Sequence, residues 1–292
     1  MSRPLFIAGT VPLYILGIAA ARQDIKMIQI PLAVAGLFLV WLIQLMTHYN
    51  NEYCDLETDL ATENPTRISG GSRVLVNKLV PRSVARVASI TSLVIAVILT
   101  INMVFLMGAG FFLPGFVGIA VFLGWFYSAR PLKLESTGWG EVTIVVVSCF
   151  LLPLAGYYLQ TFTIRPSLLI ACAPPGLLTL ALILATEIPD YKADKVTWKV
   201  TLVVRLGVAR ALWLLVANLT LGWLIFMAFI IFLWPFWGCI SALVSVAMIV
   251  PIAVKLRSGN RQRPFGIEKA GIFISLLLGY AVICFIINFL LT

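Results

Sequence analysis

The chain has 292 residues, of which 61% are hydrophobic and only 11% are charged, and its formal net charge is +9. A soluble globular domain would be about one quarter charged, so this composition excludes that class and predicts an integral membrane protein in a lipid bilayer. The positive charge does not indicate nucleic acid as a partner, because in a membrane protein the position of each cation matters more than the total.

Apolar runs of about 20 residues recur along the whole chain, and each is long enough to cross roughly 30 Å of hydrocarbon as a helix. Helices are required because the bilayer offers no water to unpaired backbone groups. We predict a single polytopic membrane domain over residues 1–292 with nine transmembrane helices. Their expected bounds are Pro4–Ala21, Ile28–Tyr49, Val84–Leu106, Ala109–Ser128, Glu141–Gln160, Ser167–Thr186, Val208–Ile231, Phe236–Val254 and Ile267–Leu291.

The basic residues are distributed unevenly between the two sides that nine alternating spans would create. Of the 21 Lys and Arg residues, only Arg22, Lys26 and Arg165 fall on the side opposite the N-terminus. Cytoplasmic loops of membrane proteins carry an excess of Lys and Arg. We therefore predict a cell-membrane protein with a cytoplasmic N-terminus, cytoplasmic polar loops and a C-terminus outside.

The second expected span runs into an acidic sequence, NNEYCDLETD. On a helix, Asn51, Asp55 and Asp59 line one face, because they are spaced by four residues. The helical rise of about 1.5 Å per residue separates Asn51 from Asp59 by roughly 12 Å, so the three cannot all bind one ion. The motif predicts a stripe of oxygen ligands for more than one cation, on a helix that continues or bends at the cytoplasmic interface.

A second acidic pair follows the sixth expected span, within the sequence TEIPDYKADK. Asp190 and Asp194 are again four residues apart, and both motifs lie on the same predicted side of the membrane. Facing carboxylates repel each other unless cations neutralise them, and Mg²⁺ suits this ligand set because it binds hard oxygen ligands together with substrate phosphates. The two motifs predict a clamp for a magnesium-bound diphosphate.

Two other interpretations of the acidic motifs stay open. A single pair of acids four residues apart is common on exposed helices and can simply end a span in solvent. Carboxylates in membrane proteins also mark ion pathways in transporters, which usually place them near the bilayer midplane. Because both motifs lie at the ends of spans and beside basic loops, we favour an enzyme over an ion-coupled transporter.

Six short motifs follow one another along most of the chain. They are NEYCDLETD at 51–59, NPTRISGGSRVL at 64–75, YSARPLKL at 127–134, GWGEV at 138–142, PDYKAD at 189–194 and TLVVRLG at 201–207. Together they resemble the motifs of the UbiA superfamily of intramembrane prenyltransferases, and most closely the 1,4-dihydroxy-2-naphthoate prenyltransferases of menaquinone synthesis. The resemblance implies an all-α integral membrane fold with nine transmembrane helices around a central cavity.

The same resemblance implies a polyprenyl diphosphate donor, Mg²⁺ as the cofactor, and an aromatic acceptor such as 1,4-dihydroxy-2-naphthoate or a related quinone precursor. Carried over to this chain, the metal ligands would be Asn51, Asp55, Asp59, Asp190 and Asp194. The residues that contact the diphosphate would be Arg67, Lys133, Lys195 and Lys199. Tyr127 would touch the diphosphate or the carbocation, and catalysis would depend on Asp55, Asp190, Lys133 and Tyr127.

An allylic diphosphate ionises when the charge growing on its leaving group is stabilised by metal ions and fixed cations in a site poor in water. The allyl cation then needs an apolar lining, and aromatic faces attract it through cation–π interactions. Aromatic residues near the ends of spans are Trp125, Phe126, Tyr127, Tyr157 and Tyr158. Such residues are also typical of the aromatic belts at membrane interfaces.

Two positions near the second motif depart from the family pattern. Lys192 stands where many relatives carry an acidic residue, and Val200 stands where a basic residue often precedes Thr201. These differences leave the acceptor open. They also allow an alternative in which the enzyme is a terpene cyclase that uses a prenyl diphosphate without any acceptor.

Overall fold

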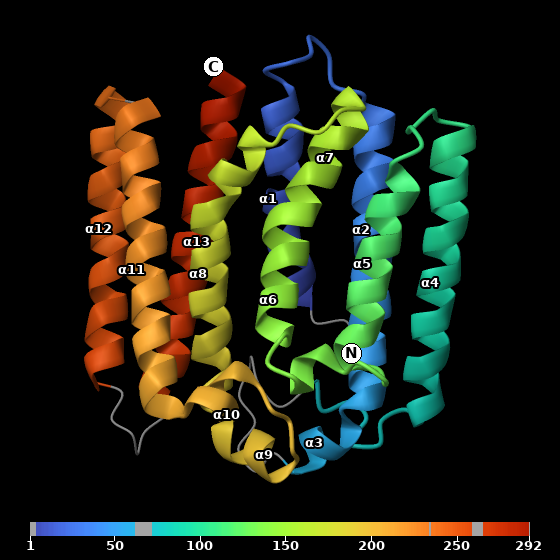
Figure 1. Cartoon of the computed structure of the whole chain (residues 1–292), viewed down its shortest axis with the longest axis vertical. Coiled ribbons are helices and arrows are strands. Elements are labelled where there is room, and N and C mark those ends of the chain that lie inside the picture. Colours follow the sequence, from blue (N-terminus) through green and yellow to red (C-terminus); the bar gives the residue numbers. More distant parts are fainter. Residues whose placement is uncertain (1–3, 62–71, 234, 259–264, 292) are drawn as a thin grey trace.

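The computed structural model describes residues 4–61, 72–233, 235–258 and 265–291, and all regular secondary structure within them is helical. Long helices run side by side, and several short helices lie together at one end of the bundle, the lower end in Figure 1. The C-terminus lies at the opposite end. The expected all-α membrane fold is therefore confirmed.

The order of the elements follows the expected spans closely. It is α1 (Pro4–Ala21), α2 (Ile30–Cys54), α3 (Leu56–Ala61), α4 (Arg82–Phe105), α5 (Leu113–Ser128), the 3₁₀ turn η1 (Leu134–Ser136), α6 (Gly140–Val145), the π-helical η2 (Val146–Leu151), α7 (Leu152–Thr161), α8 (Ser167–Glu187), α9 (Tyr191–Val196), α10 (Leu202–Leu206), α11 (Val208–Leu233), α12 (Pro235–Ser258) and α13 (Phe265–Leu291). The expected span at Glu141–Gln160 is the continuous run of α6, η2 and α7.

Six helical stretches are long and apolar enough to cross a membrane, by length and composition. They are Ile30–Cys54, Arg82–Phe105, Gly140–Thr161, Ser167–Glu187, Val208–Phe232 and Lys269–Leu291. Three further apolar stretches, Ile7–Ala21, Leu113–Ser128 and Ile240–Val254, are shorter. Within the part of the chain that the structure describes, six of the nine expected spans meet the criterion, and the count of nine stays a prediction.

The helices associate through close backbone contacts as well as through large apolar side chains. Helix α1 packs on α7 along two glycines. A Cβ atom at Gly17 would lie 1.8 Å from the carbonyl oxygen of Pro153, and one at Gly156 would lie 2.4 Å from that of Tyr14. Small residues that allow such close approach are typical of helix packing in membranes, where the hydrophobic effect does not drive helices together.

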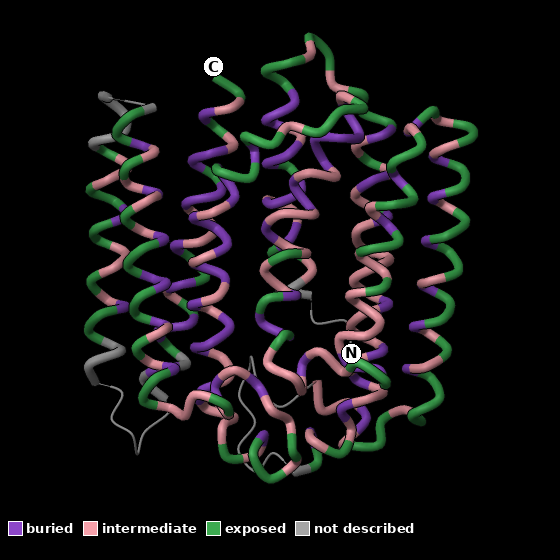
Figure 2. The backbone as a smooth tube through the Cα atoms, viewed as in Figure 1, coloured by how far each residue is buried: buried purple, intermediate pink, exposed green. Residues whose placement is uncertain are grey.

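Burial separates central helices from peripheral ones. Helix α8 packs against both α11 and α13 and is buried along much of its length, whereas α4 packs mainly on α2 and exposes many apolar side chains on its other face. Figure 2 shows this contrast between the inner and outer helices. Exposed apolar faces of this kind match a lipid environment.

Inside the bundle, an apolar cavity of about 60 Å³ lies between α1, α2, α5, η2 and α7. It is lined by side chains such as Leu39, Phe116 and Leu159 and contains no carboxylate. The short helices α3, α9 and α10 and the turn η1 form a separate polar layer at the lower end of the bundle, and this layer holds both acidic motifs.

Candidate active site

The first acidic motif spans a bend between two helices. Helix α2 ends at Cys54, Asp55 follows with φ −90° and ψ 6°, and α3 begins at Leu56. Helical hydrogen bonds continue through the bend, since the Asp55 amide donates to the Asn51 carbonyl at 2.8 Å and the Asp59 amide donates to the Asp55 carbonyl at 2.9 Å. Asn51, Asp55 and Asp59 therefore keep the four-residue spacing that the sequence predicts, and the two aspartates are buried.

The second acidic motif forms the short helix α9 and the turn after it. Asp190 directly precedes α9, and the carbonyl of Asp190 accepts a hydrogen bond from the Asp194 amide at 2.9 Å. The Lys199 amide in turn donates to the Asp194 carbonyl at 2.9 Å, which folds the chain back after α9. Helix α9 packs against α3, so the segments that carry the two motifs are adjacent although about 135 residues separate them.

Lys199 connects the two halves of the site directly. Its Nζ lies 3.0 Å from Oδ2 of Asp55 and 3.2 Å from Oε2 of Glu135, a residue of η1. Nδ2 of Asn51 donates to the same two oxygens at 3.0 and 3.1 Å and contacts Oγ of Ser128 at 2.8 Å. One polar centre thus combines the end of α2, the end of α5, η1 and the segment that follows α9.

Burial and mutual repulsion perturb the acids of this centre. Burial raises the pKa of Asp194 to about 7, and Asp190 and Asp55 raise it as well, whereas Lys199 opposes the rise. Burial likewise raises the pKa of Glu135 to about 8, with Lys199 opposing and Asp55 adding to the effect. Burial also acts to raise the pKa of Asp55, but Lys199, Glu135 and Lys133 together outweigh it and hold that pKa below its usual value. Burial acts to lower the pKa of Lys199, but Glu135 and Asp55 hold it well above its usual value.

The donor set fits a hard divalent cation. Oδ1 of Asp55 and Oε1 of Glu135 are buried and accept no hydrogen bond from the residues that the structure describes, and the same is true of Oε2 of Glu141 and Oε2 of Glu187. A buried carboxylate oxygen without a partner is costly, and cations that bind oxygen ligands relieve that cost. Among the described residues, no three His, Cys, Asp or Glu side chains form a complete metal-ligand set by themselves.

The remaining predicted site residues differ in how near they lie to this centre. Tyr127 interacts electrostatically with Glu135 and Lys199, and the charge of Lys133 acts on Asp55. Lys195 is exposed and its Nζ lies over the Tyr191 ring, 5.9 Å from the ring centroid. Arg67 lies outside the described residues.

Two buried acids of this centre were not singled out from the sequence. Glu135 follows the left-handed residue Lys133, whose φ is 40°, and its side chain is only 1% exposed. Glu141 lies at the start of α6, and its Oε1 accepts a hydrogen bond from the amide of Leu202, the first residue of α10. Glu141 lies in the motif GWGEV, and Glu135 is the residue directly after the motif YSARPLKL. The sequence does contain a signal for both residues: each is an acid near the end of an expected span, on the same predicted side of the membrane as the two acidic motifs.

Arginine and aromatic side chains flank the centre on the side of α4. The guanidinium of Arg86 lies over the rings of Trp125 and Tyr53, 4.9 and 5.2 Å from their centroids, and contacts Oδ1 of Asn50 at 3.3 Å. Trp125 thus faces a cation of the protein itself. Tyr157 and Tyr158 lie at the opposite end of the bundle: the hydroxyl of Tyr157 donates to Asp24, and that of Tyr158 accepts from the amide of Phe112. These two tyrosines, suggested above as a lining for the carbocation, do not belong to the acidic site.

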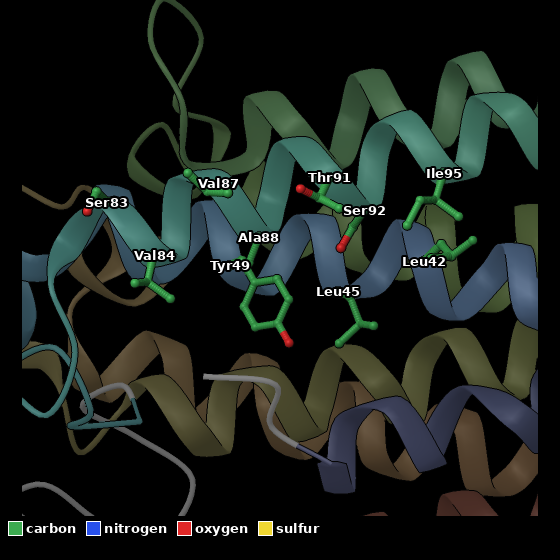
Figure 3. Close-up of a pocket in the computed structure, with 10 residues that line it drawn as sticks. All are labelled: Leu42, Leu45, Tyr49, Ser83, Val84, Val87, Ala88, Thr91, Ser92 and Ile95. Carbon is green, nitrogen blue, oxygen red and sulfur yellow. The ribbon is translucent and has the colours of Figure 1, made fainter.

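A groove of about 530 Å³ lies between α2 and α4, and Figure 3 shows its lining. Leu42, Leu45 and Tyr49 come from α2. The other lining residues come from α4 and are Ser83, Val84, Val87, Ala88, Thr91, Ser92 and Ile95. None of the groove residues carries a charge, so the groove is distinct from the polar centre.

A sequence model of the UbiA prenyltransferase family matches residues 10–289. The chain belongs to this family. As a UbiA prenyltransferase it is an enzyme that transfers prenyl groups, and the alternative of an ion-coupled transporter is set aside.

Relatives of this UbiA prenyltransferase agree with the assignment. The chain is 26% identical over 224 residues to a 1,4-dihydroxy-2-naphthoate octaprenyltransferase of Bacillus subtilis (strain 168), covering 77% of this chain and 70% of that protein. It is 27% identical over 233 residues to the protein of the same name from Mycobacterium tuberculosis (strain ATCC 25618 / H37Rv), covering 79% and 76%. A solved structure of a UbiA homolog from Archaeoglobus fulgidus bound to GPP and Mg²⁺ shares the fold, with a TM-score of 0.65, 15% identity and coverage of 98% of both chains.

Proposed function

We propose that this enzyme transfers a polyprenyl group from a polyprenyl diphosphate to 1,4-dihydroxy-2-naphthoate or a related quinone precursor, in a magnesium-dependent reaction at the cytoplasmic face of the cell membrane. The observation that carries the proposal is the convergence of both acidic motifs on one buried centre. In that centre Lys199, which follows the second motif, lies 3.0 Å from Asp55 of the first.

The carboxylates are the residues that would hold magnesium. Asn51, Asp55 and Asp59 would bind on the α2 and α3 side, and Asp190 and Asp194 on the α9 side. Mg²⁺ usually keeps several waters and shares substrate phosphates with one or two carboxylates, so a set completed by the diphosphate and water is consistent with the small number of convergent acids. When bound, Mg²⁺ stabilises the negative charge that develops on the leaving diphosphate.

The protein's own cations act on the same leaving group. Lys199 and Lys133 would donate to diphosphate oxygens, because they are the basic residues whose charge reaches Asp55. A fixed ammonium in a site poor in water stabilises developing charge without reorganising during the reaction. Tyr127, beside Glu135 and Lys199, would border the carbon end of the donor.

Apolar surroundings suit the next step. As the allylic C–O bond breaks, its electron pair leaves with the diphosphate, and a ring carbon of the acceptor then attacks the allyl cation. The helices above the polar layer are lined by apolar side chains, which do not capture the cation as water would. With 1,4-dihydroxy-2-naphthoate as the acceptor, loss of the ring carboxylate as CO₂ restores aromaticity.

The acceptor is taken from the names of the curated relatives, and the orientation is taken from the distribution of basic residues. The loop after α1 carries Arg22 and the loop between α7 and α8 carries Arg165, and both loops lie at the upper end of Figure 1. Nη1 of Arg165 lies 3.2 Å from Oδ2 of Asp24. Lys133, Lys195 and Lys199 lie at the lower end with the acidic motifs. The excess of positive charge at that end supports its assignment to the cytoplasm.

The test is a product analysis by mass spectrometry. Purified enzyme with Mg²⁺ and geranylgeranyl diphosphate, or a longer donor, would be incubated in parallel with dihydroxynaphthoate, hydroxybenzoate, homogentisate or no acceptor. We expect a prenylated, decarboxylated naphthoquinol in the first reaction only. A prenylated benzoate would contradict the proposed acceptor, and a cyclic hydrocarbon without an acceptor would support the cyclase alternative instead.

A further inference from the structure

Glu135 is almost completely enclosed in the polar centre and has no role in the reaction described above. Its side chain is 1% exposed, compared with 6% for Asp55 and 19% for Lys199. It belongs to η1, between α5 and α6, and therefore to neither acidic motif. Its position beside the proposed metal ligands calls for a physical explanation, because acids are almost never fully buried unless they are paired.

The contacts of Glu135 repeat those of Asp55. Oε2 of Glu135 lies 3.2 Å from Nζ of Lys199 and 3.1 Å from Nδ2 of Asn51, and Oδ2 of Asp55 lies 3.0 Å from each of the same two nitrogens. Two donors are thus shared by two acceptors. This arrangement fixes the orientation of Asn51 and Asp55, two of the proposed metal ligands.

Each of the two carboxylates also keeps one oxygen without a partner. Oδ1 of Asp55 and Oε1 of Glu135 are both buried and accept no hydrogen bond within the described part of the chain. The pair has two carboxyl groups and one ammonium, so a proton or a second cation must balance it. Lys199 satisfies one oxygen of each group, and the two remaining oxygens are the ones available to an incoming cation.

We propose that Glu135 is a positioning residue of the metal site: it holds Asn51 and Lys199 in place around Asp55, and its charge strengthens the binding of the divalent cation, which Lys199 weakens. The inference rests on the proposed magnesium site. It assigns opposite effects on metal affinity to two residues that contact each other.

Two substitutions separate these effects. Glu135→Gln keeps the size of the side chain and an oxygen that accepts from Asn51, but it cannot take a negative charge when a cation replaces the balancing proton, so Lys199 pairs with Asp55 alone and competes with the metal. Lys199→Met keeps the length of the side chain but removes the ammonium, so the two carboxylates are left for the cation. A residue with a merely structural role would give no such pair of opposite changes.

The experiment is a titration of purified wild-type and variant enzymes with Mn²⁺ in the absence of donor, with free Mn²⁺ measured by electron paramagnetic resonance. We expect Glu135→Gln to raise the Kd for Mn²⁺ by about 10-fold, within the range found for residues that orient metal ligands. Lys199→Met is expected to lower it several-fold. Glu135→Asp is expected to bind more tightly than Glu135→Gln, because it restores the charge. Glu57→Gln is the matched control, because Glu57 is an exposed acid on α3. The Kd of this variant for Mn²⁺ should equal that of the wild type.

Each adverse outcome has a distinct meaning. If the wild type binds Mn²⁺ and the Kd of Glu135→Gln is within twofold of the wild-type Kd, the inference is wrong and the proposed function stands. If Glu135→Gln and Lys199→Met both weaken binding and both lose helical circular dichroism on mild heating, the two residues are structural and the inference is wrong. If the wild type shows no saturable binding of Mn²⁺, the proposed magnesium site fails and the inference fails with it.

Discussion

The two ends of the bundle both contain a carboxylate, a basic residue and a tyrosine, but they arrange them differently. At the upper end, Oδ2 of Asp24 accepts from the Tyr157 hydroxyl at 2.6 Å and from Arg165 at 3.2 Å. The side chains of Arg165 and Asp24 are 32% and 43% exposed. At the lower end, Asp55 and Glu135 share Lys199 in a buried centre where some carboxylate oxygens have no partner.

This difference separates a structural contact from the proposed functional centre. The upper cluster joins the loop after α1 to the loop before α8, and water can replace any contact that is lost. The lower cluster concentrates negative charge in a place that water reaches poorly, where unpartnered acids are destabilising. A protein keeps such an arrangement where a ligand completes it, and this is the physical reason for placing the reaction at the lower end.

Removal of divalent cations should have the largest effect and tests the lower end alone. We expect EDTA to reduce prenyl transfer to background, because Lys199 and Lys133 carry only two positive charges against several acids and a diphosphate, and divalent cations would supply the rest. Added Mg²⁺ should restore the rate, as measured by product formation from a labelled donor. Full activity in EDTA would contradict the metal assignment, and the lower end would then no longer differ from the upper end as a proposed metal site.

Neutralising one acid of each motif comes next. Asp55→Asn and Asp190→Asn are expected to lower kcat by about 100- to 1000-fold, the range for loss of one group that stabilises a transition state electrostatically. Asn keeps the volume of Asp, so helical circular dichroism should not change. Glu57→Gln, an exposed acid on α3, serves as the control. If either Asp55→Asn or Asp190→Asn kept its full rate at saturating Mg²⁺, the proposed role of that motif would be wrong.

The proposed contact of Lys133 with the diphosphate predicts a smaller effect. Lys133→Ala should raise the KM for the donor by roughly 10- to 100-fold, because a hydrogen bond to a charged group contributes about 1.5–3 kcal/mol. Lys192→Ala is a matched control, since Lys192 is an exposed lysine of α9. Steady-state kinetics with varied donor measures both variants. An unchanged KM for Lys133→Ala would show that its charge, which acts on Asp55, does not reach the substrate.

The spans and the acidic motifs could be predicted from the sequence because each depends on local spacing. The expected Pro4–Ala21 coincides with α1, and the four-residue spacing of Asn51 and Asp55 holds across the bend after Cys54. Hydrophobic length and helical periodicity determine such features without reference to the rest of the chain. Tertiary contacts were needed only to bring the second motif to the first.

Glu135 could not be predicted in the same way, because its burial depends on three segments far apart in the sequence. It is enclosed by the end of α2, its own turn and Lys199. Asn51 at the end of α2 lies 84 residues before Glu135 in the sequence, and Lys199 lies 64 residues after it. The assignment of Tyr157 and Tyr158 as a possible lining failed for a related reason: both ends of a bundle have aromatic residues near span ends, and composition does not say which end holds the site. Lys192, which departs from the family pattern, is exposed, so its charge does not replace a ligand inside the centre.

The smallest effect is expected at the upper end. Asp24→Asn removes the carboxylate that Arg165 and Tyr157 contact, but the amide oxygen can still accept a hydrogen bond and both partners of the ion pair are partly exposed. Exposed ion pairs contribute about 0–1 kcal/mol, so the free energy of unfolding should fall by no more than about 1 kcal/mol. The kcat and the KM for donor should equal those of the wild type, as measured beside Asp55→Asn under the same conditions. If Asp24→Asn slowed turnover as strongly as Asp55→Asn, the upper cluster would take part in the reaction, and burial with unpartnered oxygens would no longer distinguish the catalytic end of the bundle from the structural one.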